Sequence, residues 1–171
     1  MQDELWDIYD QNRHKIGRVH RRADPLLKGD YHLVVMACLL NSKGEFLITK
    51  RAPTKSYANL WEFPGGCAVA GDDGFTAAIR EVKEETGLDV DTDIYKLVIS
   101  LKLEKAFLEV WVFLQDFDIN DVILLPGETV DAKYATMNEI REMMDEGKFF
   151  PDEFLEELFV AAKEMLMYNL S

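Results

Sequence analysis

The chain has 171 residues, of which 32 are acidic and 19 basic, so its net charge is −13. The acidic excess is concentrated in residues 116–171 and argues against binding to long nucleic acid, which requires a basic surface. No apolar run approaches the roughly 20 residues of a membrane span, and the acidic N-terminus is unlike a signal peptide. Two cysteines, Cys38 and Cys67, are too few for a disulfide framework. We therefore expect one cytoplasmic domain over residues 1–171.

The hydrophobic pattern predicts strands and helices in an order typical of a mixed sheet flanked by helices. Two short strands, 6–9 and 16–21, would form an N-terminal hairpin extension within residues 1–30. Further apolar segments of strand length lie at 32–40, 45–51, 60–64, 94–105, 107–117 and 133–136. Helical spacing occurs at 74–86, 138–146 and 152–169, the last forming a C-terminal helix within residues 151–169. This order favours an α/β or α+β fold.

Three carboxylates crowd the last turns of the helix predicted at 74–86. Glu81, Glu84 and Glu85 stand at i, i+3 and i+4, so the helix places all three on one face, where like charges repel. They also lie near the helix C-terminus, where the macrodipole disfavours anions. A divalent cation such as Mg²⁺ would offset both penalties, because it takes carboxylate oxygens as ligands and commonly bridges to substrate phosphates.

This stretch resembles the box of the Nudix family, G-x5-E-x7-R-E-U-x-E-E-x-G-U, where U is aliphatic. The matching residues are Gly66, Arg80, Glu81, Val82, Glu84, Glu85, Gly87 and Leu88. Asp72 stands where the family has glutamate, and Val69 where many members carry another acid. The opening of the chain and the strand at 32–40 are similar to the Nudix subgroup related to isopentenyl-diphosphate isomerase. The resemblance implies a Nudix-type α/β/α sandwich with a central mixed sheet.

The resemblance also implies a reaction and a set of roles. The reaction is metal-dependent hydrolysis of a diphosphate linkage, in a nucleoside diphosphate derivative or a similar small phosphorylated metabolite, with Mg²⁺ or Mn²⁺. Glu81, Glu84 and Glu85 are the expected metal ligands and catalytic carboxylates, and a backbone carbonyl at Gly65 would complete the metal shell. Arg80 would orient the box by pairing with Asp72 or a nearby carboxylate.

Further candidates lie outside the box. Many family members use one more carboxylate, for which Glu128 is the first choice and Glu109 the second. Lys50 and Arg51 end a strand near the site and could bind substrate phosphate. Gly65 and Gly66 would form a flexible loop that permits close backbone approach.

Two other functions compete with hydrolysis. An isopentenyl-diphosphate isomerase needs a cysteine that alignment places at Gly65, whereas Cys67 falls where that enzyme has a metal-binding histidine. His32 matches another histidine position of the isomerase, although a structural role suits it better. A non-catalytic ligand-sensing Nudix domain would often have lost box carboxylates, which are retained here. The apolar face of the C-terminal helix could serve the core or a homodimer interface.

Overall fold

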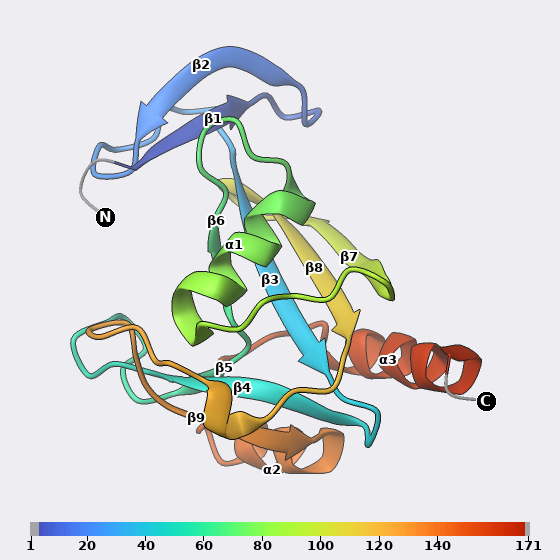
Figure 1. The fold of residues 1–171 in the computed structure, drawn as a ribbon. Helices are drawn as coiled ribbons and strands as arrows, with labels where there is room; N and C mark the ends of the chain where they lie inside the picture. Colours follow the sequence, from blue (N-terminus) through green and yellow to red (C-terminus); the bar gives the residue numbers. More distant parts are fainter. Residues whose placement is uncertain (1–3, 170–171) are drawn as a thin grey trace.

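The computed structural model describes residues 4–169 and contains one mixed sheet, a separate hairpin and three α-helices (Figure 1). The strands are β1 (Leu5–Tyr9), β2 (Lys15–Arg21), β3 (His32–Leu40), β4 (Glu45–Arg51), β5 (Trp61–Glu62), β6 (Gly65–Cys67), β7 (Tyr95–Lys102), β8 (Ala106–Leu114) and β9 (Thr129–Thr136). The helices are α1 (Gly74–Thr86), α2 (Met137–Asp145) and α3 (Leu155–Asn169), with a 3₁₀ turn η1 (Ile119–Asp121). None of the helices within residues 4–169 is both long and apolar enough to cross a membrane.

The larger sheet has seven strands, of which five follow the order β5-β4-β3-β8-β7. The short strand β6 pairs with β3, and β9 pairs with β4. The central pair β3–β8 is parallel, whereas the pairs of β3 with β6, β4 with β9 and β7 with β8 are antiparallel. The predicted mixed sheet of an α+β fold is therefore confirmed.

The side chains of β3 alternate between two hydrophobic cores, as expected of a strand buried on both faces. Leu33, Val35, Ala37 and Leu39 belong to a core shared with α1, which contributes Ala77, Ala78 and Val82. Cys38 and Leu40 belong to the opposite core, which contains residues of α2 and α3 such as Ile140 and Phe159. Helices thus cover both faces of the sheet, which is the predicted α/β/α sandwich.

Local signals set the ends of α1. Asp73 is the N-cap and its side chain accepts a hydrogen bond from the Thr76 N–H at 2.8 Å. Gly87 ends the helix with φ 72°, a left-handed conformation that glycine adopts without a steric penalty. Helix α1 therefore begins and ends at the residues predicted from the sequence, 74 and 86.

Some predicted assignments were wrong, and those at β6 and β9 depend on pairing between distant segments. Gly65 and Gly66 are not a flexible loop but part of β6, where they pair with Met36 and Val35. Strand β9 begins at Thr129 rather than at 133, because its whole length pairs with β4. Helix α3 begins at Leu155 rather than at 152.

The hairpin β1–β2 forms its own two-stranded sheet and is tied to the loop before α1. Asp7 accepts hydrogen bonds from Lys15 Nζ at 2.7 Å and from the Gly71 N–H at 2.9 Å. In addition, Trp6 stacks on His32 at the start of β3, with ring centroids 4.2 Å apart. The hairpin is therefore anchored beside the segment that leads into α1 (Figure 1).

Candidate functional site

The three glutamates of α1 line one cavity of about 290 Å³. Helical spacing turns them toward the same side, and the glycine pair of β6 forms part of the opposite wall. The lining residues are Glu4, Arg22, Lys55, Gly65, Gly66, Glu81, Glu84, Glu85, Leu125 and Glu128. The cavity thus collects carboxylates from α1 and from the segment before β9, together with two basic side chains.

Glu85 is the most deeply buried of the three glutamates. Glu85 is only 5% exposed, and one of its carboxylate oxygens has no hydrogen-bond partner among the described residues. Burial, together with the charges of Glu62 and Glu81, raises the pKa of this carboxyl to about 8. Burial also raises the pKa of Glu81. Carboxylates whose charge is disfavoured in this way suit a site that a cation would complete.

Arg80 holds the box together. Its guanidinium donates hydrogen bonds to Asp72 at 3.1 Å, to Glu81 at 3.0 Å and to Glu84 at 3.1 Å. A fourth hydrogen bond, at 3.0 Å, reaches the backbone carbonyl of Cys67 in β6. The expected pairing with Asp72 is therefore present despite the shorter aspartate, and Arg80 fixes α1 against β6.

The carboxyl group of Glu81 approaches Gly66 closely. A Cβ atom added at Gly66 would lie 2.6 Å from the carboxyl carbon of Glu81, closer than Cβ contacts normally come. At Gly65, an added Cβ would collide with the Val35 backbone carbonyl of the paired strand. The glycine pair therefore provides space for the box carboxylate and for strand pairing, rather than flexibility.

Glu128, the first choice from the sequence, also lines the cavity. It is 9% exposed, forms an ion pair with Lys55, and its carbonyl accepts a hydrogen bond from the Ala52 N–H at 2.9 Å. Glu109, the second choice, does not line this cavity. It packs against Gly74 at the N-terminal end of α1, where it pairs with Arg13 and accepts a hydrogen bond from Trp111 at 3.0 Å.

The basic residues at the cavity are not those that the sequence suggested. Lys50 lines neither this cavity nor the larger one beside it, and its ammonium lies 5.7 Å from the Trp61 ring centroid. Arg51 is held by Glu62, through contacts of 2.7 and 2.9 Å to the two carboxylate oxygens. The cavity instead contains Lys55 and Arg22, which the sequence analysis missed. Neither belongs to a motif, and only the fold brings them to the box.

The histidine and cysteine candidates His32, Cys38 and Cys67 line neither cavity. Burial lowers the pKa of His32 to about 4, so the imidazole stacked on Trp6 is neutral at pH 7. Burial raises the pKa of the Cys67 thiol to about 11, which leaves it a poor proton donor and acceptor at neutral pH. Cys38 is fully buried in the core.

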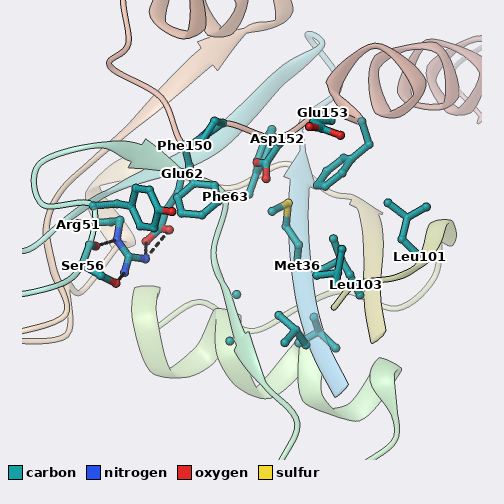
Figure 2. Close-up of a pocket in the computed structure, with 18 residues that line it drawn as sticks. Met36, Arg51, Ser56, Glu62, Phe63, Leu101, Leu103, Phe150, Asp152 and Glu153 are labelled. Atoms are coloured by element: carbon teal, nitrogen blue, oxygen red, sulfur yellow. Dashed lines mark hydrogen bonds and ion pairs between the residues drawn. The ribbon is translucent and has the colours of Figure 1, made fainter. Parts of the chain in front are cut away.

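A second, larger cavity of about 620 Å³ adjoins the first (Figure 2). Gly65 and Gly66 line both cavities, so the two meet at β6. Aromatic and aliphatic side chains make up much of the wall of the larger one, including Tyr57, Phe63 and Phe150. Its volume falls within the range of roughly 300–1,000 Å³ that is typical of small-molecule sites.

The donor set of the smaller cavity fits a hard divalent cation. It offers carboxylate oxygens, which Mg²⁺ and Mn²⁺ prefer, and within residues 4–169 one buried Glu85 oxygen has no hydrogen-bond partner. Among residues 4–169, no three histidine, cysteine, aspartate or glutamate side chains already surround a common point. Glu81 and Glu84 each accept a hydrogen bond from Arg80.

Comparison with known proteins identifies the family. A family model described as the NUDIX domain matches residues 30–158. A Nudix hydrolase of Listeria monocytogenes is 35% identical over 158 residues, which cover 91% of this chain and 94% of the relative. An isopentenyl-diphosphate Delta-isomerase of Pectobacterium atrosepticum is 26% identical over 144 residues, which cover 80% of this chain and 79% of that enzyme.

The fold is similar to that of solved structures. A crystal structure of a Deinococcus radiodurans protein matches with a TM-score of 0.74 at 24% identity, covering 93% of this chain and 99% of that one. At that level of identity the match supports the fold, while the family model and the Listeria relative support membership. The chain therefore belongs to the Nudix family and is a Nudix hydrolase, for which cleavage of pyrophosphate bonds is the general reaction.

Proposed function

We propose that the protein hydrolyses the diphosphate linkage of a nucleoside diphosphate derivative, or of a similar small phosphorylated metabolite, with Mg²⁺ or Mn²⁺ as cofactor. The observation that carries this proposal is the cavity in which Glu81, Glu84, Glu85 and Glu128 converge. Buried carboxylates with raised pKa values near a glycine-lined wall suit a metal and a diphosphate far better than a solvated helix face.

In this proposal Glu81, Glu84 and Glu85 hold the cation, with the Gly65 carbonyl as a further ligand. A bound divalent cation polarises phosphoryl oxygens, activates water and neutralises charge on the leaving phosphate. Arg80 acts as a positioning residue, because its hydrogen bonds orient Glu81 and Glu84. Glu128 lies across the cavity, where one of the carboxylates takes the proton from the attacking water.

The phosphate-binding role that the sequence analysis gave to Lys50 and Arg51 is better filled by Lys55 and Arg22. Both line the cavity beside the glutamates, where their charges can stabilise phosphate oxygens. Arg22 follows β2 and pairs with Glu4 at 2.7 Å, so the N-terminal hairpin contributes to the site. We therefore propose that residues 1–30 act with the rest of the chain as one catalytic domain.

The isomerase alternative is less well supported, although an isomerase is among the relatives. Gly65 stands where the resemblance requires the catalytic cysteine, and the raised pKa of the Cys67 thiol disfavours proton transfer at neutral pH. The non-catalytic alternative is disfavoured because the box retains Glu81, Glu84 and Glu85.

A panel of nucleoside diphosphate derivatives, assayed for phosphate release with Mg²⁺ and with Mn²⁺, tests the proposal. We expect metal-dependent turnover of at least one substrate class, and Glu85→Gln to lower it at least ~100-fold. Absence of metal-dependent turnover across the panel would refute hydrolysis. Near wild-type rates in the glutamine variant would place the chemistry elsewhere, and proton exchange into isopentenyl diphosphate would favour the isomerase instead.

A further inference from the structure

Two side chains of the N-terminal hairpin, Asp7 and Lys15, bind the loop that leads into α1. Asp7 Oδ2 accepts a hydrogen bond from the Gly71 N–H at 2.9 Å, and Lys15 Nζ donates one to the Asp72 carbonyl at 3.1 Å. The two side chains also pair with each other at 2.7 Å, and this hydrogen bond from Lys15 lowers the pKa of the Asp7 carboxyl, which is therefore ionised at neutral pH. The hairpin thus holds two consecutive residues of the loop.

The side chain of Asp72 connects this loop to the box. Its carboxylate accepts a hydrogen bond from Arg80 Nε at 3.1 Å. The same guanidinium donates hydrogen bonds to Glu81 at 3.0 Å and to Glu84 at 3.1 Å. A continuous series of hydrogen bonds therefore joins the hairpin, through the backbone of the loop and one arginine, to two of the proposed metal ligands.

The length of the Asp72 side chain makes the position of the loop critical. Asp72 is one methylene shorter than the glutamate of the box pattern, so its carboxyl reaches Arg80 only from a loop that lies close to α1. Their contact of 3.1 Å is near the long limit of about 3.2 Å for such hydrogen bonds, so a loop displaced by about 1 Å would lose it. A glutamate could keep the contact, because one further C–C bond extends its reach by roughly 1 Å.

We propose that Asp7 and Lys15 are positioning residues, which hold the loop before α1 so that the short aspartate of the box keeps Arg80 in the orientation that fixes the glutamates. Neither side chain touches the substrate in this view. The inference rests on the proposed function for its effect on turnover, whereas the contact between Arg80 and Asp72 can be measured independently of any reaction. The hairpin then has a second role, besides carrying Arg22 to the cavity.

Exchange of the Arg80 Nε–H proton with water tests this contact directly. The exchange rate would be measured by ¹H–¹⁵N NMR in the metal-free protein in EDTA, where a proton that is hydrogen-bonded to Asp72 exchanges slowly. We expect Asp7→Ala to speed the exchange ~10-fold or more, because the released loop no longer holds the aspartate against the guanidinium. A role confined to the stability of the hairpin would leave this rate unchanged.

The same substitution in an Asp72→Glu background shows whether Asp7 acts through the aspartate. The longer side chain can reach Arg80 from a displaced loop, so Asp7→Ala should there change the exchange rate less than ~3-fold. Turnover should follow the same pattern, with a substrate identified by the panel. We expect Asp7→Ala to lower kcat ~10-fold when residue 72 is aspartate and less than ~3-fold when it is glutamate.

Two further variants separate the loop contact from damage to the hairpin. Lys15→Met keeps a side chain of similar length but loses the hydrogen bond to the loop carbonyl, so it should change both readouts in the same direction, and it replaces Asp7→Ala if that variant fails to fold. Asp10→Asn is the control, because it removes a carboxylate from the same hairpin whose side-chain hydrogen bonds stay within the turn. It should leave both readouts within about twofold of wild type.

Several outcomes would overturn the inference without affecting hydrolysis. They are rapid exchange of the Arg80 proton in wild-type protein, an exchange rate that neither hairpin variant changes, an equally large effect in the Asp72→Glu background or in Asp10→Asn, and an unchanged kcat in Asp7→Ala. The expected exchange pattern in a protein without metal-dependent turnover would support the positioning of Arg80 and refute the hydrolase proposal instead.

Discussion

Replacing Glu85 by glutamine should stabilise the metal-free protein while removing its activity. The ordinary pKa of this side chain is 4.5, and burial raises it to about 8 in the folded protein. Ionisation is therefore harder in the folded state than in the unfolded state. A tenfold change in acidity corresponds to about 1.4 kcal/mol, so at pH 7 the buried carboxyl costs the folded state about 3 kcal/mol.

The sign of this effect sets its pH dependence. Below pH 4.5 the carboxyl is protonated in both states and contributes nothing. As the pH rises toward 8 the unfolded state loses its proton first, so the folded state is progressively disfavoured. Glutamine cannot ionise, but its amide remains buried. We therefore expect Glu85→Gln to raise the free energy of unfolding by about 1–3 kcal/mol at pH 8, and by less than about 1 kcal/mol at pH 5.

Urea unfolding in EDTA at pH 5, 6, 7 and 8 measures this difference. Glu84→Gln is the matched control, because it changes the same charge on the same helix at a half-exposed side chain and should alter stability little. Addition of MgCl₂ should stabilise the wild type more than Glu85→Gln, because the carboxylate would then bind the cation. A Glu85→Gln variant that is less stable than wild type at pH 8, or whose gain is the same at pH 5 and pH 8, would refute the reasoning.

Three further substitutions test the roles of individual side chains. Lys55→Ala should raise KM about tenfold and leave kcat less affected, because it removes positive charge beside the phosphate site. Lys55→Arg should preserve most of the affinity. Unchanged steady-state kinetics in the alanine variant would contradict this role of Lys55. Glu128→Gln should lower kcat about 100-fold in the same assay, because it removes a carboxylate from the proposed catalytic cavity. A wild-type kcat in this variant would exclude Glu128 from the chemistry. Glu109→Gln should leave kcat within about twofold but lower the free energy of unfolding, measured in urea, by about 1–3 kcal/mol. The reason is that Glu109 is buried and the substitution leaves the charge of Arg13 uncompensated. A large loss of turnover at unchanged stability would instead assign Glu109 to the catalytic site.

Helix α1 was predictable from the sequence because its determinants are local. The spacing of Glu81, Glu84 and Glu85 follows from helical geometry alone, and the caps at Asp73 and Gly87 lie next to the helix they bound. The pairing of Arg80 with Asp72 was also expected, because both residues belong to one continuous motif. Strand β3 was predicted in the same way, from the apolar run at 32–40.

The sequence ranked Glu128 above Glu109 but could not place either side chain relative to the box. Glu128 precedes a predicted strand and Glu109 lies on one, and only the fold places Glu128 at the cavity and Glu109 at the N-terminal end of α1. Lys55 and Glu128 are separated by 73 residues, yet they form an ion pair. No local pattern distinguishes Lys55 from Lys50, which lies on the preceding strand β4.

The sequence by itself determined the helix that carries the three glutamates and the family, because contiguous residues carry both. Tertiary structure decided which distant side chains share the cavity with that helix: Lys55, Arg22 and Glu128 reach it through the pairing of β9 with β4 and the docking of the hairpin. The physical reason is that helix periodicity and capping act over a few residues, whereas a cavity is formed by segments whose proximity depends on the packing of the whole chain.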